Sequence, residues 1–126
     1  VFANIPVGIE IYDQNGFMID INNKDMEIFG VRDKADVLGV NVFDNSNISE
    51  EIRERMRNEE KLDFRMNYTF TSIREYYESE RKGYIALYTK VSKFFGKDGK
   101  FLGYIWITPS NWMLSKRYRI LKTSSF

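Results

Sequence analysis

The fold of this 126-residue chain is decided by residues 7–39, VGIEIYDQNGFMIDINNKDMEIFGVRDKADVLG. On both sides of Asn15-Gly16, apolar residues alternate with polar or small ones, the pattern of half-buried β-strands. Both turn positions tolerate a positive φ, which suits a two-residue turn between twisted strands. The stretch therefore opens with a predicted β-hairpin, in which Val7, Ile9 and Ile11 face the core.

After the hairpin the apolar period changes to that of short helices. Asn22 or Asn23 can cap a first helix through its side-chain oxygen, and Gly30 can end it. A second short helix is predicted from near Asp33 to Gly39. A third is predicted to begin at Asn47 or Ser49, because acidic residues fill its first turn.

The second half of the chain reads as β-structure. LDFRMNYTFT at 62–71 alternates strictly, GYIALYTKVSKFF at 83–95 is a long strand, and FLGYIWIT at 101–108 follows a turn at Lys97-Asp98-Gly99. Together with the hairpin this predicts an α+β fold: a five-stranded antiparallel sheet with short helices inserted between strands two and three.

The chain divides into one domain over residues 1–109 and a C-terminal segment over 110–126. At 126 residues the chain has the length of a single domain. Within the C-terminal segment, NWMLSKRYRILK suits a connecting helix, although its pattern would also fit a strand or a tail. A start without Met suggests a piece of a longer protein.

Several glycine and polar positions occur in an order that resembles a PAS domain. They are Gly16, Asn22, Gly30, Gly39, Asn41, Phe43, Asp98-Gly99-Lys100 and Gly103. The resemblance covers about residues 1–108 and implies the PAS-like sheet and helices described above. One departure is that the family's usual Asp-x-Thr after the last strand is not evident in YIWITPSNW at 104–112.

The resemblance implies a sensory or signal-transmission domain of a larger bacterial signalling protein, such as a two-component histidine kinase. We expect such a domain to be non-catalytic, to act in the cytoplasm and to pass its signal to an effector domain in the same full-length chain. It would bind a small ligand in its core, mediate dimerisation, or do both.

Composition excludes several kinds of chemistry. The sequence has no Cys and no His, which removes thiol and imidazole catalysis, and the His-ligated haem and Cys-linked flavin of some PAS domains are therefore not expected. The cofactor is otherwise unidentified. A formal net charge of +1 gives no attraction to polyanions, so nucleic-acid and membrane contacts are not predicted.

A candidate ligand pocket is formed by apolar residues that we predict to point inward from helices and sheet. They are Met26, Phe29, Phe43, Ile52, Met56, Phe64, Met66, Tyr68, Leu87 and Ile105. The alternative is a filled core, since protein interiors are close-packed. Tyr68 could anchor a ligand or bond to backbone or water, because a buried phenol needs a partner.

Carboxylates are the remaining candidates for acid/base chemistry. Glu10, Asp20 and Asp63 alternate with apolar residues and are predicted to face solvent, where their pKa values would not be tuned for catalysis. The enzymatic alternative is a small, cone-shaped, isomerase-like α+β enzyme, for which Tyr68 is the inward candidate.

The aromatic residues outnumber what one core face can hold. Tyr84, Tyr88, Tyr104 and Trp106 are predicted on the outer face of the sheet. An aromatic outer face predicts a homodimer contact there or through the terminal segments, or cover by the chain's own ends. A pure dimerisation module with a filled core is the third functional alternative.

Overall fold

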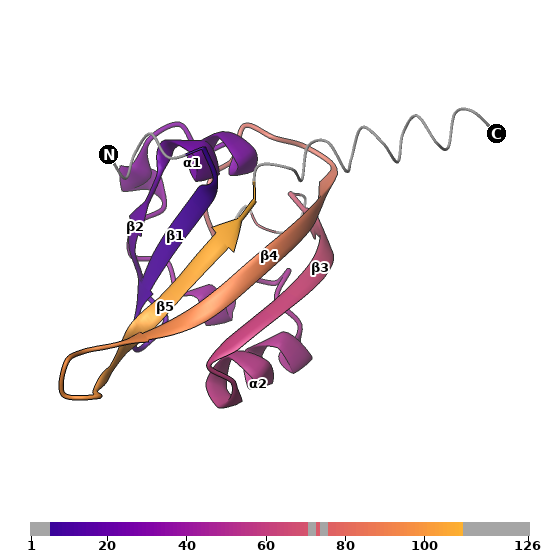
Figure 1. Cartoon of the computed structure of the whole chain (residues 1–126). Coiled ribbons are helices and arrows are strands. Elements are labelled where there is room, and N and C mark those ends of the chain that lie inside the picture. Colours follow the sequence, from indigo (N-terminus) through magenta and orange to yellow (C-terminus); the bar gives the residue numbers. More distant parts are fainter. Residues whose placement is uncertain (1–5, 71–72, 74–75, 110–126) are drawn as a thin grey trace.

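A computed structural model describes residues 6–70, 73 and 76–109 of the chain (Figure 1). Its elements are β1 (Gly8–Asp13), β2 (Met18–Ile21), α1 (Asn23–Phe29), the 3-10 helices η2 (Lys34–Asp36) and η3 (Val42–Asp44), α2 (Glu50–Asn58), β3 (Lys61–Thr69), β4 (Tyr84–Phe95) and β5 (Phe101–Thr108). The predicted α+β fold and the order of its elements are confirmed. The predicted C-terminal segment over 110–126 lies outside the described residues.

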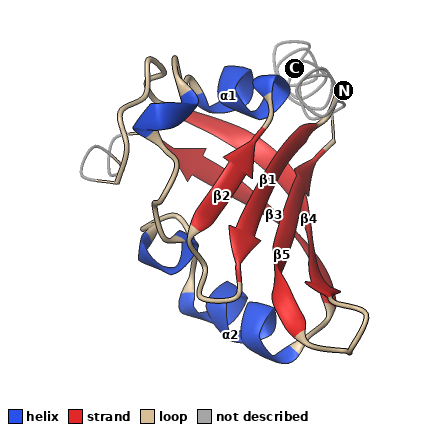
Figure 2. Ribbon diagram, turned by 90° about the vertical axis from the view of Figure 1, so that its left-hand side faces the viewer, coloured by secondary structure: helices blue, strands red, loops and turns tan. Residues whose placement is uncertain are grey.

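All five strands form one antiparallel sheet in the order β2-β1-β5-β4-β3. The last strand, β5, therefore lies in the middle, between β1 and β4. Figure 2 shows the helices and their connecting loops on one face of this sheet, with α1 and α2 at opposite ends. The core lies between that face and the helical layer. Within the described part of the chain, no helix has the length and apolar character needed to cross a membrane.

Asn22 begins α1 and fastens it to the sheet. Its Oδ1 accepts hydrogen bonds from the backbone N–H of Asp25 at 3.0 Å and of Ile9 at 2.9 Å, while its Nδ2 donates to the Val7 carbonyl at 2.7 Å. The residue is fully buried. One side chain thus caps the helix and takes the place of a β1 ladder partner, which confirms the predicted cap and chooses Asn22 over Asn23.

The remaining short helices follow the same capping rules. Asp33 caps η2 through a bond to the Ala35 N–H at 2.9 Å, so the second predicted helix exists as a single 3-10 turn. Ser49 caps α2 through the Ile52 N–H at 3.2 Å. The N-terminus of α2 is therefore the later of the two predicted positions. Gly30 ends α1 at φ 70°, as predicted.

The prediction for the faces of β1 was wrong. Gly8, Glu10 and Tyr12 are buried on the helix-facing side, whereas Ile9 and Ile11 are half-buried on the outer face. Glu10, predicted to face solvent, is only 9% exposed. The isoleucines lie on the outer face, and the buried face carries Glu10 and Tyr12. The alternation of apolar and polar residues therefore could not tell which face the helices would cover.

The same inversion occurs on β5, which pairs with β1 residue by residue. Tyr104 and Trp106 lie in the core opposite Tyr12 and Glu10, and not on the outer face as predicted. Ile105, predicted to point inward, is half-buried on the outer face opposite Ile11. Because paired residues on neighbouring strands share a face, the inversion of β1 requires that of β5.

Candidate functional site: an acidic internal cavity

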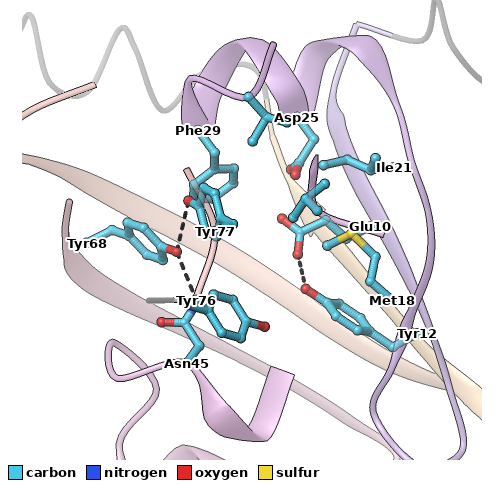
Figure 3. Close-up of a pocket in the computed structure, with 12 residues that line it drawn as sticks. Glu10, Tyr12, Met18, Ile21, Asp25, Phe29, Asn45, Tyr68, Tyr76 and Tyr77 are labelled. Atoms are coloured by element: carbon cyan, nitrogen blue, oxygen red, sulfur yellow. Dashed lines mark hydrogen bonds between the residues drawn. The ribbon is translucent and has the colours of Figure 1, made fainter. Parts of the chain in front are cut away.

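A cavity of about 30 Å³ lies inside the fold, between the sheet and α1 (Figure 3). The residues that line it are Glu10, Tyr12, Met18, Ile21, Asp25, Phe29, Val31, Val37, Asn45, Tyr68, Tyr76 and Tyr77. Among the described residues, the lining contains two carboxyl groups, four phenols and one amide, and no Lys or Arg. This is an unusually acidic interior, because charged side chains are rarely buried without a partner.

Glu10 projects into the cavity from β1. Its carboxylate accepts a hydrogen bond from the hydroxyl of Tyr12, two residues along the same face of the strand. Burial raises the pKa of Tyr12 well above its ordinary value, and the negative charge of Glu10 raises it further. Tyr12 therefore stays protonated and serves Glu10 as a fixed donor.

Asp25 enters the cavity from the first turn of α1. The residue is 1% exposed, and neither carboxylate oxygen has a hydrogen-bond partner among the described residues. Burial, and next the charge of Glu10, raise the pKa of Asp25 well above its ordinary value. Figure 3 places the two carboxyl groups on the same side of the cavity, so a proton or another positive charge between them relieves their repulsion.

The opposite wall of the cavity is a hydrogen-bonded group of polar side chains. The Tyr68 hydroxyl lies 3.0 Å from Asn45 Nδ2, which donates to it, and 3.1 Å from the Tyr77 hydroxyl. Phe29 packs edge-on against the Tyr68 ring, with 4.9 Å between ring centroids. Burial raises the pKa of Tyr68 to about 12, so this wall is neutral at physiological pH.

Tyr76 separates the cavity from the protein surface. Its ring lines both the inner cavity and a surface depression beside Phe17 and Asn41. Its hydroxyl is buried, and within the described part of the chain it has no hydrogen-bond partner. Burial raises the pKa of Tyr76, so the hydroxyl keeps its proton. The cavity thus contains a second buried polar group that lacks a partner.

The segment that carries Tyr76 and Tyr77 is attached to the end of α1. The Ser79 hydroxyl donates to the Phe29 carbonyl at 2.5 Å, and the Glu80 N–H donates to the Gly30 carbonyl at 2.8 Å. A Cβ on Gly30 would lie 2.6 Å from Ser79 Oγ. Gly30 is therefore needed both for its left-handed backbone and for this close approach.

Of the ten predicted pocket residues, the structure brings Phe29 and Tyr68 to the cavity. Met56, Phe64 and Leu87 are buried elsewhere in the core. The remaining inward predictions, Met26, Phe43, Ile52 and Met66, are partly buried and pack against that core. Ile105 lies on the outer face, because the whole of β5 presents its other side to the helices.

The polar residues that line the cavity were missed. Glu10 stands between two isoleucines on a predicted strand, and a charge in that position is a signal of a buried site when the strand is central. Asp25 was read only as a residue that favours the first turn of a helix. Tyr76 and Tyr77 lie in a charged connection whose path could not be predicted.

The arrangement of sheet and helices is similar to that of several solved PAS domains. A PAS domain from Colwellia psychrerythraea matches with a TM-score of 0.61 and 18% identity, over 85% of this chain and 87% of that one. The PAS domain of an HTR-like protein from Haloarcula marismortui matches with a TM-score of 0.62 and 18% identity, over 85% and 83%. The PAS domain of BvgS from Bordetella pertussis gives 0.57 and 20%, over 95% and 84%.

The chain has the PAS fold. At these identities the likeness is one of fold, and it confirms the predicted resemblance at that level. No family model matches the sequence, and no curated protein matches it significantly. In this PAS fold, the acidic cavity lies between the helical layer and the inner face of the sheet.

Proposed function

We propose that this chain is a non-catalytic sensory domain of a larger bacterial signalling protein, such as a two-component histidine kinase, and that it responds to a small ligand in its interior. It would act in the cytoplasm, next to an effector domain in the same full-length chain. The observation that carries the proposal is an internal cavity lined by two buried polar groups, Asp25 and Tyr76, that have no hydrogen-bond partner among the described residues.

Such groups are costly in a domain whose only task is to fold. A buried polar group without a hydrogen bond costs about 1–3 kcal/mol, and more if it is charged. Apolar residues at positions 25 and 76 would fill the same space without that cost. A bound ligand that supplies the missing hydrogen-bond partners would remove this cost and stabilise the folded state. The partnerless groups therefore favour a binding role.

The size of the cavity argues against the enzymatic alternative. Two carboxyl groups, those of Glu10 and Asp25, do face the interior, but a cavity of about 30 Å³ holds no more than a few heavy atoms. A substrate pocket is about tenfold larger. Among the ten predicted pocket residues we propose Phe29 and Tyr68 as ligand contacts. The others form or pack against the filled core, except Ile105, which lies on the outer face.

A ligand can transmit a signal only if it binds two conformations with different affinities. Tyr76 and Tyr77 belong to the cavity wall and are attached to the end of α1 through Ser79 and Glu80. Filling the cavity would therefore alter the packing of this segment first. That change would pass to α1 through the bonds at Phe29 and Gly30.

The experiment is to fill the cavity by single methylene groups. Val31→Ile and Val37→Ile add volume at two buried residues that line it, and Val91→Ile adds the same volume to the core elsewhere. In the full-length signalling protein, we expect the first two variants to change signal output and the third to leave it unaltered. Equal output from all three would refute a sensory role for the cavity.

Dimerisation is the second candidate, because the outer face of the sheet is apolar over β1 and β5. Ile9 lies opposite Ile107 and Ile11 opposite Ile105, which forms a block of four isoleucines, the outer isoleucine patch. We propose that a second copy of this chain packs on the patch. A two-fold contact would place identical apolar side chains against one another, which suits an isologous interface.

A further inference from the structure

We infer that the cavity binds a small ammonium cation, either ammonium itself or a primary alkylammonium of one or two carbons, between the carboxylates of Glu10 and Asp25. This inference rests on the proposed function and names the chemical class of the ligand. Three properties of the cavity carry it: its charge, its unpaired acceptors and its size.

The charge of the cavity selects a cation. Two carboxyl groups line it, and the described lining has no basic side chain to neutralise them. Two acids that share a desolvated site cannot both ionise unless a positive charge joins them. An anionic ligand would add a further negative group to this site, whereas an ammonium ion can bind both carboxylates once Asp25 releases its proton.

The unpaired atoms match the donors of an ammonium group. Asp25 has two free carboxylate oxygens, and the Tyr76 hydroxyl oxygen has a free acceptor position. On Glu10, Oε1 already accepts a hydrogen bond from the Tyr12 hydroxyl. An –NH3⁺ group has three N–H donors and no acceptor, so every one of its bonds can be made to these oxygens. A charge-assisted bond to a carboxylate is about twice as strong as a neutral one.

The aromatic wall distinguishes an organic cation from a metal ion. The rings of Phe29, Tyr12 and Tyr68 line the cavity, and aromatic rings attract ammonium groups within about 6 Å of their centroids. Within the described ranges, no group of three or more metal-ligating side chains is present. The carboxylates and aromatic rings of the site therefore suit an organic ammonium ion better than a metal ion.

The cavity volume limits the length of the ligand. A water-sized group requires roughly 10–15 Å³ on this scale, so about 30 Å³ accommodates about two heavy atoms. Ammonium and methylammonium fit directly, and ethylammonium needs a small outward movement of the wall. Tetramethylammonium has the same charge but is too large for the cavity.

The test uses methylammonium chloride with the full 126-residue chain at neutral pH. We expect it to raise the melting temperature more than equal concentrations of potassium chloride or tetramethylammonium chloride. Asp25→Asn and Glu10→Gln should each weaken the affinity at least tenfold. Asp63→Asn, which removes an exposed carboxylate from the outer face of β3, should bind as well as the unmodified chain.

A second measurement does not depend on the stability of the variants. With ¹³C-labelled methylammonium, nuclear Overhauser contacts should join the methyl group to ring protons of Tyr12 or Tyr76. Absence of these contacts, or equal stabilisation by potassium and tetramethylammonium, would overturn the inference.

The outcomes also separate this inference from the proposed function. A neutral or anionic molecule that stabilises the chain, and loses its effect in Val37→Ile, would overturn the ammonium class but support an interior sensor. If cavity-filling variants leave signal output unchanged while methylammonium binds, the ammonium site stands and its sensory role fails.

Discussion

The carboxylate of Asp25 on α1 lies directly against Gly8 on β1: a Cβ on Gly8 would approach Asp25 Oδ1 to 2.7 Å. The same hypothetical atom would lie 3.0 Å from the side chain of Ile28. This contact sets how closely the helix can approach the sheet. It also places Asp25 on the same side of the cavity as Glu10, two residues farther along β1.

Gly8→Ala should therefore destabilise the domain by about 1–3 kcal/mol, since an added methyl group must displace α1. Urea unfolding of the two proteins measures the difference. The cost should fall in an Asp25→Ala background, because one of the close contacts is then gone. An unchanged cost in that background would show that Asp25 does not limit the approach.

Replacing Asp25 should change how stability depends on pH. An unfolded Asp has a pKa of about 3.9, and the folded pKa of Asp25 is raised well above that. Between the two values the folded state binds the extra proton, so stability is present at low pH and is lost as pH rises toward the folded pKa. Among the described residues, Glu10 is the other carboxyl group that lines the cavity, and the pKa values of the four phenols are raised, which keeps them neutral.

Asp25→Asn removes that titration. Its stability relative to the unmodified chain should increase as pH rises from the unfolded pKa toward the raised folded pKa, by up to ~1.4 kcal/mol per pH unit. Urea unfolding at several pH values gives this difference directly. Asp63→Asn serves as the control and should show no such trend. A constant difference for Asp25→Asn would mean that its carboxyl group titrates normally in the folded state.

Asn22→Ala should be among the most damaging single polar substitutions. It removes a helix cap, one bond to β1 at Ile9 and one to Val7 just before β1, all at a fully buried position, so a loss of about 2–4 kcal/mol is expected. Asn23→Ala is the matched control, because Asn23 is exposed at the next position. Thermal unfolding should place Asn23→Ala within about 0.5 kcal/mol of the unmodified chain. Similar losses from both variants would show that the hydrogen bonds of the Asn22 side chain do not hold α1 to the sheet.

Tyr68→Phe should lower stability by about 1–3 kcal/mol, because it leaves the Asn45 amide and the Tyr77 hydroxyl without their shared partner. Tyr84→Phe removes a hydroxyl from an exposed ring and should have almost no effect. Calorimetric melting compares the two. If Tyr68→Phe is as mild as the control, the polar wall of the cavity makes no net contribution to folding.

Ile105→Lys should dissociate a dimer formed through the outer isoleucine patch, since a charge at the centre of an apolar contact loses its hydration. Light scattering after size exclusion measures the mass. Asn67→Lys adds the same charge to an exposed position of β3, away from the patch, and should leave the mass unaltered. A monomeric unmodified chain, or a dimer that survives Ile105→Lys, would refute dimerisation through the outer isoleucine patch.

The sequence predicted local backbone structure correctly where a single residue type determines it, as at a helix cap or a glycine with positive φ. The hairpin around Gly16, the cap at Asn22 and the stop at Gly30 were all predicted, and Gly16 and Gly30 have positive φ as their positions require. The predicted two-residue turn was wrong, because Asn15 has no positive φ and the turn takes in Gln14, Asn15 and Gly16. Only two of the predicted pocket residues reached the cavity, because the prediction relied on which face of each strand is apolar.

By itself, the sequence determined the order of strands and helices, their caps and turns, and hence the α+β class, because each of these depends on the conformational preference of a few adjacent residues. Only the tertiary structure decided which face of β1 and β5 meets the helices. Both faces of these central strands carry apolar side chains, and the approach of α1 at Gly8 selects the face with Glu10. That choice brings two carboxyl groups from separate elements into one desolvated cavity, a juxtaposition that no local pattern encodes.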